Sequence, residues 1–137
     1  MGGFTGLKLL LDTHVILWSA AEPERFPQNI AVELENESNE LWFSPISVWE
    51  ILLLAEKGRV ILEADHKMSI RKMLQSLPIR EAVINQEVAI QSRYVALSHQ
   101  DPADRFLAAT AMVYGLTLVT ADKRLTGAKE FPVLPIP

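Results

Sequence analysis

The segment LKLLLDTHVILW, residues 7–18, joins a short apolar run to a helix-like stretch through a single aspartate, Asp12. The apolar run 7–11 is typical of a strand buried in a parallel sheet, where both faces are covered. Residues 13–20 are expected to be helical. A strand that passes directly into a helix is the start of a βαβ unit, so the segment predicts an α/β fold.

The same alternation continues along the chain. Short apolar runs predict further strands at 41–44, 116–120 and 133–134. The clearest helix is 101–115, because Asp101 suits its N-cap and Gly115 its C-terminal end. Other helices are expected from Pro27 towards Asn39 and over 45–57, 67–77 and 86–97. The pattern predicts a central parallel sheet with helices on both faces.

Length and composition limit the class of protein. A chain of 137 residues fits one domain, and without cysteine it has neither a disulfide nor a thiolate metal site. Its apolar runs are short for a membrane span, and its start, MGGFTGLKLLLD, lacks the long apolar region of a signal peptide. We expect one cytoplasmic domain over 1–137 that does not enter a membrane, with residues 1–6 disordered.

Four acidic side chains stand near the ends of the expected strands. Asp12 and Asp122 follow strands closely, whereas Glu50 and Asp104 lie within the first two turns of helices. In parallel α/β sheets, ligands bind beyond the carboxyl ends of the strands. The sequence therefore predicts that these four carboxylates meet at one edge of the sheet.

Carboxylates gathered in this way repel one another. Two unit charges about 4 Å apart cost about 4 kcal/mol at an effective dielectric constant of about 20, and a helix N-terminus returns only about 0.3–1 kcal/mol. Mg²⁺ or Mn²⁺ removes the repulsion, since hard cations take oxygen ligands. The charge balance fits such a site, because the 17 acids exceed the 13 bases by the size of this quartet.

Each acid also has a structural interpretation. Asp12 and Asp101 can serve as helix N-caps, and Asp104 can complete a capping box with Asp101. Asp122 can cap the turn DKRL. Glu50 is harder to explain, because it interrupts the apolar run SVWEILLLA, where an unpaired carboxylate is costly.

The helix expected over 45–57 is apolar around most of its circumference. One stripe consists of Val48, Ile51, Leu52 and Ala55, and off that stripe lie Trp49, Leu53 and Leu54. Such a helix is buried on more than one side. We expect the helical hairpin 45–78 to form a partner or dimer surface, with burial inside the domain as the alternative.

Four segments resemble the PIN-domain ribonucleases, in particular the VapC-like toxins of bacterial toxin–antitoxin pairs. They are LLLDTHVILW, SPISVWEI, HQDPADRFLAATA and LVTADKRL, and they occur in the family's order over nearly the whole chain. By this resemblance, the acidic quartet that holds Mg²⁺ or Mn²⁺ consists of Asp12, Glu50, Asp104 and Asp122. Supporting positions of the family are matched by Thr13, Ser47, Asp101 and Thr120.

The resemblance implies a PIN-like three-layer sandwich that cleaves RNA endonucleolytically. A metal-activated water would attack phosphorus in line and leave a 5′-phosphate and a 3′-hydroxyl. Asp12, Asp104 and Asp122 would hold the metal, and Glu50 would hold a second ion or order the water. The resemblance also implies a small antitoxin partner and a homodimer.

Basic residues around the connection 57–72 and beside the expected site are candidates for RNA binding. They are Lys57, Arg59, Lys67, Arg71, Lys72, Arg105, Lys123 and Arg124. A solvated surface position is the alternative for each. The histidines His14, His66 and His99 are isolated in the sequence, and a surface or capping role is preferred for His99 over a metal-ligand role.

Two other functions compete with this interpretation. One is a non-catalytic PIN-like module that acts through a protein partner or an operator complex. The other is a receiver-like phosphoacceptor, which needs an acidic pair where only Asp12 is present. The sequence contains neither a GxSxG elbow nor a GxxxxGKS/T loop, so nucleophilic-serine and P-loop chemistry have no support.

Overall fold

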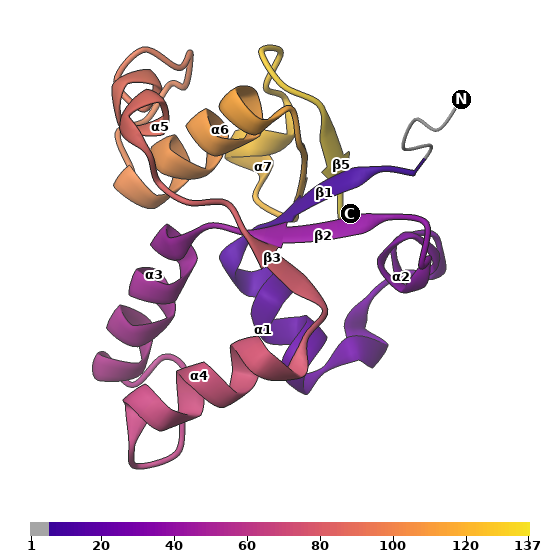
Figure 1. Ribbon diagram of the computed structural model, residues 1–137, viewed down its shortest axis with the longest axis vertical. Helices are drawn as coiled ribbons and strands as arrows, with labels where there is room; N and C mark the ends of the chain where they lie inside the picture. The colour runs from indigo at the N-terminus through magenta and orange to yellow at the C-terminus, as the bar shows by residue number, and fades with distance from the viewer. Residues whose placement is uncertain (1–5) are drawn as a thin grey trace.

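A computed structural model describes residues 6–137, in which one parallel β-sheet lies between two layers of helices (Figure 1). Within these residues the strand order is β3-β2-β1-β4-β5, and every neighbouring pair is parallel. The strands are β1 (Lys8–Leu11), β2 (Glu40–Phe43), β3 (Ile79–Glu81), β4 (Thr117–Thr120) and β5 (Val133–Pro135). The expected α/β three-layer sandwich is confirmed.

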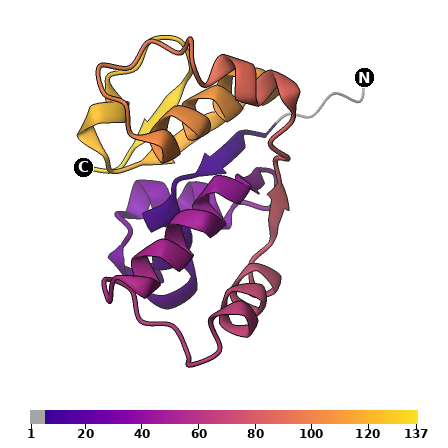
Figure 2. The ribbon, with the colours of Figure 1, turned by 90° about the vertical axis from the view of Figure 1, so that its left-hand side faces the viewer.

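The helices divide between the two faces of the sheet. One face is covered by α1 (Thr13–Ala21), α2 (Gln28–Glu35), α3 (Pro45–Glu56) and α4 (His66–Ser76), with a 3-10 turn, η1 (Pro23–Arg25), between α1 and α2. The other face is covered by α5 (Gln86–Gln91), α6 (Pro102–Tyr114) and α7 (Lys123–Thr126). Figure 2 shows the same separation from the side, with α5, α6 and α7 above the strands.

Each face of the sheet has its own apolar core, and β1 contributes to both. Leu9 and Leu11 pack with Ile51 of α3 in one core, while Leu10 packs with Leu107 of α6 in the other. These three strand leucines are at most 1% exposed. Because alternate side chains of a strand point to opposite faces, a central strand covered on both sides needs the uninterrupted apolar run seen here.

The register of the sheet brings several chain segments to one edge. Leu11 is paired with Val119, so β1 and β4 end at the same level. Asp12 extends this pairing by donating its backbone N–H to the carbonyl of Val119 at 3.1 Å. The chain leaves this edge of the sheet into α1, α3 and α7, and the three helices therefore begin close to one another.

The strand β3 was not expected from the sequence. It has only three residues, follows Pro78, and carries the exposed charges of Arg80 and Glu81. Edge strands often carry charges that discourage pairing with other chains, and these residues hide the apolar alternation that identifies a strand. Its parallel pairing with β2 places it at the end of the sheet.

Two helices end earlier than expected. The prediction of a helix over 86–97 was wrong beyond Gln91. In a longer helix, the backbone carbonyls of Ser92 and Val95 would accept from backbone N–H groups. Here they accept hydrogen bonds from the guanidinium of Arg105. The helix expected to reach Asn39 ends at Glu35, and the side chain of Asn39 instead donates to the carbonyl of Glu33.

Two further expectations concern disorder at residues 1–6 and the absence of a membrane-spanning helix. The disorder expected over 1–6 concerns residues 1–5, which lie outside the described residues, and Gly6, which forms a bend before β1. None of the helices formed by residues 6–137 has the length and apolar character that crossing a bilayer requires.

Packing inside the domain covers much of the apolar surface of α3. Ile51 is fully buried, Val48 and Leu52 pack against the core on the same face, and Ile46 packs against the other core. Trp49 remains 49% exposed. Burial inside the domain therefore explains most of the helix, and a partner surface over 45–78 remains a prediction that Trp49 supports.

Candidate active site

Five carboxylates from four chain segments line one cavity at the carboxyl edge of the sheet. The cavity has a volume of about 320 Å³ and is lined by Asp12, His14, Trp18, Glu50, Asp101, Asp104, Ala121, Asp122 and Arg124. It contains every member of the predicted quartet together with Asp101. The structure thus brings together acids that are up to 110 positions apart in the sequence.

Asp12 is the N-cap of α1 and also a wall of the cavity. Its Oδ1 accepts from the backbone N–H of Thr13, and its Oδ2 accepts from the hydroxyl of Thr120, both at 2.6 Å. The residue is only 8% exposed, and burial raises the pKa of its carboxyl against the opposing effect of these hydrogen bonds. The capping and functional interpretations of Asp12 are therefore compatible.

Three buried hydroxyl groups form hydrogen bonds next to the acids that line the cavity. Thr120 Oγ1 donates to Asp12 and accepts from the backbone N–H of Asp122 at 3.0 Å, so it ties the ends of β1 and β4 together. The hydroxyls of Thr13 and Ser47 are hydrogen-bonded to each other at 3.0 Å, which joins α1 to α3. These contacts position the backbone around the acids.

Glu50 comes from α3 and is half-buried. Burial raises the pKa of its carboxyl, a hydrogen bond with Thr13 opposes the rise, and the charges of Asp12 and Asp101 add to it. A carboxyl in this environment holds a proton more readily than an ordinary glutamate. The polar interruption of the apolar helix is thus explained by its place in the cavity.

Asp104 lies in the first turn of α6 and is 6% exposed. Burial raises its pKa to about 6, a hydrogen bond with His99 opposes the rise, and the charges of Asp101, Asp122 and Asp12 add to it. Asp101 is the N-cap of α6 and accepts from the backbone N–H of Asp104 at 3.3 Å. The capping role expected for Asp101 is thus present, and its side chain also lines the cavity.

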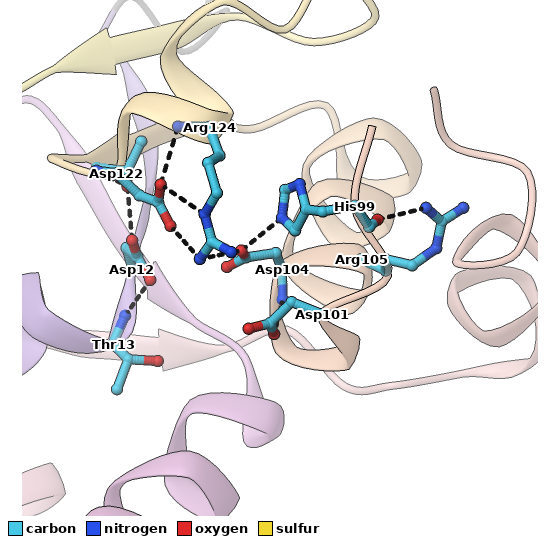
Figure 3. Close-up of polar contacts among 9 residues, drawn as sticks. Asp12, Thr13, His99, Asp101, Asp104, Arg105, Asp122 and Arg124 are labelled. Carbon is cyan, nitrogen blue, oxygen red and sulfur yellow. Dashed lines mark hydrogen bonds and ion pairs between the residues drawn. The ribbon is translucent and has the colours of Figure 1, made fainter. Parts of the chain in front are cut away.

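His99 lies against Asp104, which the sequence did not reveal. Its Nε2 is 2.8 Å from Asp104 Oδ2, and its side chain is only 17% exposed (Figure 3). The preferred surface or capping role for His99 was therefore wrong. The signal available in the sequence was its position five residues before Asp104, in the loop that leads into α6.

Asp122 is the N-cap of α7 and is held by Arg124. Its Oδ1 accepts from the backbone N–H of Arg124 at 2.9 Å, and its Oδ2 is 2.9 Å from Arg124 Nη2. These hydrogen bonds lower the pKa of the Asp122 carboxyl, against the effect of burial. The Asp122 carboxyl therefore gives up its proton more readily than an ordinary aspartate, whereas the shifts of Asp12, Glu50 and Asp104 have the opposite sign.

The acids fit a divalent cation chemically but are not preassembled around one. Among residues 6–137, no three His, Asp or Glu side chains converge closely enough to form a ready-made ligand set. However, all the acids that share the cavity offer oxygen donors, the ligands that Mg²⁺ and Mn²⁺ prefer. Besides burial, the charges of the neighbouring aspartates raise the pKa of Asp104, and a bound cation would relieve this repulsion.

The predicted RNA-binding bases occupy different surroundings. Arg105 is 5% exposed and donates to the carbonyls of Ser92, Val95 and His99, so its assignment to RNA binding was wrong. Figure 3 shows its guanidinium on the far side of His99 from the acids. Arg124 lines the cavity. The remaining candidates are exposed: Lys57, Arg59, Lys67, Arg71, Lys72 and Lys123.

A second cavity adjoins the first and contains Arg25, which the sequence did not single out. It has a volume of about 430 Å³ and shares His14 and Trp18 with the carboxylate cavity. Arg25 and Arg59 also line it, and the guanidinium carbon of Arg25 lies 4.8 Å from the ring centre of Trp18. Arg25 stands in the 3-10 turn η1, and no local pattern predicts its contact with Trp18.

Comparison with known proteins places the chain in a family. The PIN domain family profile matches residues 9–130. The chain is 35% identical to the ribonuclease VapC22 of Mycobacterium tuberculosis (strain ATCC 25618 / H37Rv) over 120 residues, which cover 85% of this chain and 88% of that protein.

Solved structures support the same assignment at the level of the fold. The VapBC2 complex of Rickettsia felis bound to a promoter DNA fragment contains a chain with a TM-score of 0.68 and 12% identity, covering 96% of this chain and 100% of that one. DNA-bound VapBC of Salmonella typhimurium gives a TM-score of 0.66 at 18% identity, covering 94% and 98%. Together with the sequence matches, these findings show that the chain belongs to the PIN-domain family.

Proposed function

We propose that this protein is a metal-dependent endoribonuclease and the toxin of a toxin–antitoxin pair. The observation that carries the proposal is that Asp12, Glu50, Asp104 and Asp122 line one cavity at the carboxyl edge of the sheet. Identity of 35% to a protein named as a ribonuclease supports RNA as the substrate. The proposed cofactor is Mg²⁺ or Mn²⁺.

Asp12, Asp104 and Asp122 would hold the cation. A bound divalent ion supplies charge neutralisation at the phosphodiester and lowers the pKa of a water molecule. Both Asp12 oxygens are already oriented by hydrogen bonds from Thr13 and Thr120, which leaves each with a free lone pair. This orientation reduces the reorganisation that binding requires.

Glu50 would hold a second ion or order the attacking water. Its raised pKa makes its carboxylate a better proton acceptor near neutral pH than an ordinary glutamate. The proposed reaction is in-line attack of water on phosphorus, which breaks the bond between phosphorus and the 3′ oxygen and leaves a 5′-phosphate. The departing 3′ oxygen would take a proton from solvent water and become the 3′-hydroxyl. The proton of the attacking water would pass to a carboxylate oxygen of Glu50 in the version with one ion.

The RNA would reach the cavity along its basic surroundings. Arg25 and Arg59 line the adjoining cavity, and Lys123 is exposed beside Asp122. Lys57, Lys67, Arg71 and Lys72 lie farther along the hairpin 45–78 and would contribute to long-range attraction. RNA as the substrate also makes the cytoplasm the proposed location.

The proposed partners are an antitoxin and a second copy of the chain. Several structural neighbours are named VapBC, one of them as a member of the VapBC family of toxin–antitoxin systems, which supports a small antitoxin partner. The half-exposed Trp49 on α3 supports a buried protein surface in that region. We expect a homodimer, measurable by sedimentation equilibrium without antitoxin.

A non-catalytic binding module remains the alternative function. The observation that favours it is that Arg124 already contacts Asp104 and Asp122, so two acids are partly neutralised without a metal. Such a module would bind its partner but would not cleave RNA, whatever cation is added.

RNA cleavage by the purified chain, without antitoxin, distinguishes these functions. We expect cleavage with Mn²⁺ or Mg²⁺, none with EDTA, and a loss of at least about 100-fold in Asp104→Asn. The matched control is Asp65→Asn, the same chemical change at the exposed N-cap of α4, where asparagine also caps. Cleavage that resists EDTA, or equal cleavage by Asp104→Asn and Asp65→Asn, contradicts the proposal.

A further inference from the structure

The guanidinium of Arg124 lies between two carboxylates of the proposed metal site. Its Nη2 is 3.1 Å from Asp104 Oδ2 and 2.9 Å from Asp122 Oδ2, and its Nε is 3.2 Å from Asp122 Oδ1. Figure 3 shows the head group spanning the space between the two acids, with His99 on the other side of Asp104. One cationic group thus contacts acids that belong to two different helices.

The local fold places Arg124 in this position. Asp122 caps α7 by accepting from the backbone N–H of Arg124, so the side chain of Arg124 begins beside the carboxylate that it binds. The fork of the guanidinium then contacts both oxygens of Asp122 and still reaches Asp104. Arginine is suited to this task because its planar donors match carboxylates in pairs.

The neighbouring residue provides an internal comparison. Lys123 also carries a positive charge on α7 and is exposed. Among the ion pairs of residues 6–137, none joins Lys123 to an acid of the cavity. Proximity on the same helix therefore does not by itself place a cation between the two carboxylates.

We propose that Arg124 is a built-in counter-ion of the carboxylate cavity, which competes with the divalent cation for Asp104 and Asp122. This inference rests on the proposed metal-dependent function and concerns how the site is held without the ion. The oxygens that Arg124 contacts are among those that the cation would need. Two like charges cannot share them at contact distance without strong repulsion.

Cation binding therefore requires the guanidinium to leave at least one carboxylate. The side chain is 54% exposed, so water can accommodate the head group once it moves. In the cation-free protein, Arg124 relieves part of the repulsion among the acids and keeps the cavity intact. Arg124 thereby stabilises the empty site and weakens the affinity of the site for metal.

Titration calorimetry with Mn²⁺ on the full chain tests this competition in three proteins: the unmodified chain, Arg124→Gln and Lys123→Gln. Both substitutions remove one positive charge from α7, so long-range electrostatics change equally. We expect Arg124→Gln to bind Mn²⁺ about five- to ten-fold more tightly, because it loses a direct competitor. Lys123→Gln should change the affinity by about two-fold or less, since exposed charges are screened.

Thermal unfolding provides a second readout and shows whether each variant is folded. Without metal, Arg124→Gln should melt at a lower temperature than the unmodified chain, because its acids have lost their counter-ion. Saturating Mn²⁺ should raise its melting temperature more than that of Lys123→Gln. Arg124→Lys, which keeps the charge without the fork, should bind Mn²⁺ with intermediate affinity.

The outcomes separate this inference from the proposed function. Equal Mn²⁺ affinities for Arg124→Gln and Lys123→Gln would overturn the competition and leave the metal site standing. No Mn²⁺ binding by any of the proteins at millimolar concentration would overturn both. Binding by Arg124→Gln alone would support the competition in its strongest form.

Discussion

The pKa of Asp104 shows how strongly burial and neighbouring acids affect a single carboxyl group. It is almost fully buried, and three further aspartates raise its pKa in the direction that burial already favours. His99 and Arg124 offset part of this effect through direct contacts. The resulting pKa of about 6 lies in the range where small changes of pH alter the charge of the site.

We predict that the metal-free protein is more stable near pH 5 than near pH 7. Because the pKa of Asp104 is about 6 in the folded chain against an ordinary value of 3.8, the folded state binds more protons between these values. The free energy of unfolding therefore falls as the pH rises through this window. We expect a difference of about 1–3 kcal/mol, measured by urea denaturation in EDTA.

The neighbouring acids do not reverse the predicted dependence of stability on pH. The pKa values of Asp12 and Glu50 are also raised, so they act in the same direction. The lowered pKa of Asp122 contributes stability that is lost only below its ordinary value of 3.8, outside the window. Asp104→Asn should flatten the pH dependence, and greater stability near pH 7 than near pH 5 in EDTA would contradict the account.

At the scale of residues, the sequence identified the acids but not their basic partners. An aspartate at the end of a strand is a local signal, visible for Asp12 and Asp122 without any tertiary structure. The contacts of Arg124, Arg105 and His99 depend on how separate segments pack, and nothing in a single sequence distinguishes an exposed arginine from one that binds buried carbonyls. The error with Arg105 has this cause.

Helix α6 places acids of the cavity at its N-terminal end, and capping residues define both of its ends. Asp101 caps its start, and Gly115 ends it in the left-handed conformation, with φ 67°. The boundaries of this helix could be predicted because capping chemistry is local. The end of the shorter α5 could not be predicted in this way. It depends on Arg105, which lies thirteen residues beyond Ser92 and donates to its carbonyl.

Gly115→Ala should lower the free energy of unfolding by about 1 kcal/mol, because a Cβ strains the left-handed backbone. Gly127→Ala is the matched control: its φ is −91°, and at either glycine a Cβ would meet no atom within 4 Å. The control should stay within about 0.5 kcal/mol of the unmodified chain in urea denaturation. Equal effects of the two substitutions would show that backbone strain is not the cause.

Arg105 holds the loop between α5 and α6 through three backbone carbonyls. We predict that Arg105→Met lowers the free energy of unfolding by about 2–4 kcal/mol, because these acceptors lose their donors inside the protein. Arg93→Met, at an exposed position of the same region, should change it by at most about 0.5 kcal/mol. If Arg105→Met lowers the free energy of unfolding no more than Arg93→Met does, the hydrogen bonds of Arg105 do not stabilise the fold.

At the scale of the whole molecule, the parallel sheet converts distant sequence positions into neighbours. The hydrogen bond between Thr120 and Asp12 joins residues 108 positions apart and follows directly from the pairing of β1 with β4. The alternation of strands and helices was sufficient to predict this convergence. It was not sufficient to predict the rotamers of the acids or the place of Arg124 among them.

The proposed function depends on one physical property: acids from four separate segments form a cavity that takes a divalent cation. Anomalous diffraction at the manganese edge, from crystals of the full chain grown with Mn²⁺, tests it most directly. We predict an anomalous peak within bonding distance of Asp12 and Asp104 oxygens, with Arg124 withdrawn from at least one carboxylate. Mn²⁺-saturated crystals that show no peak in this cavity, with Arg124 still between Asp104 and Asp122, would contradict the claim.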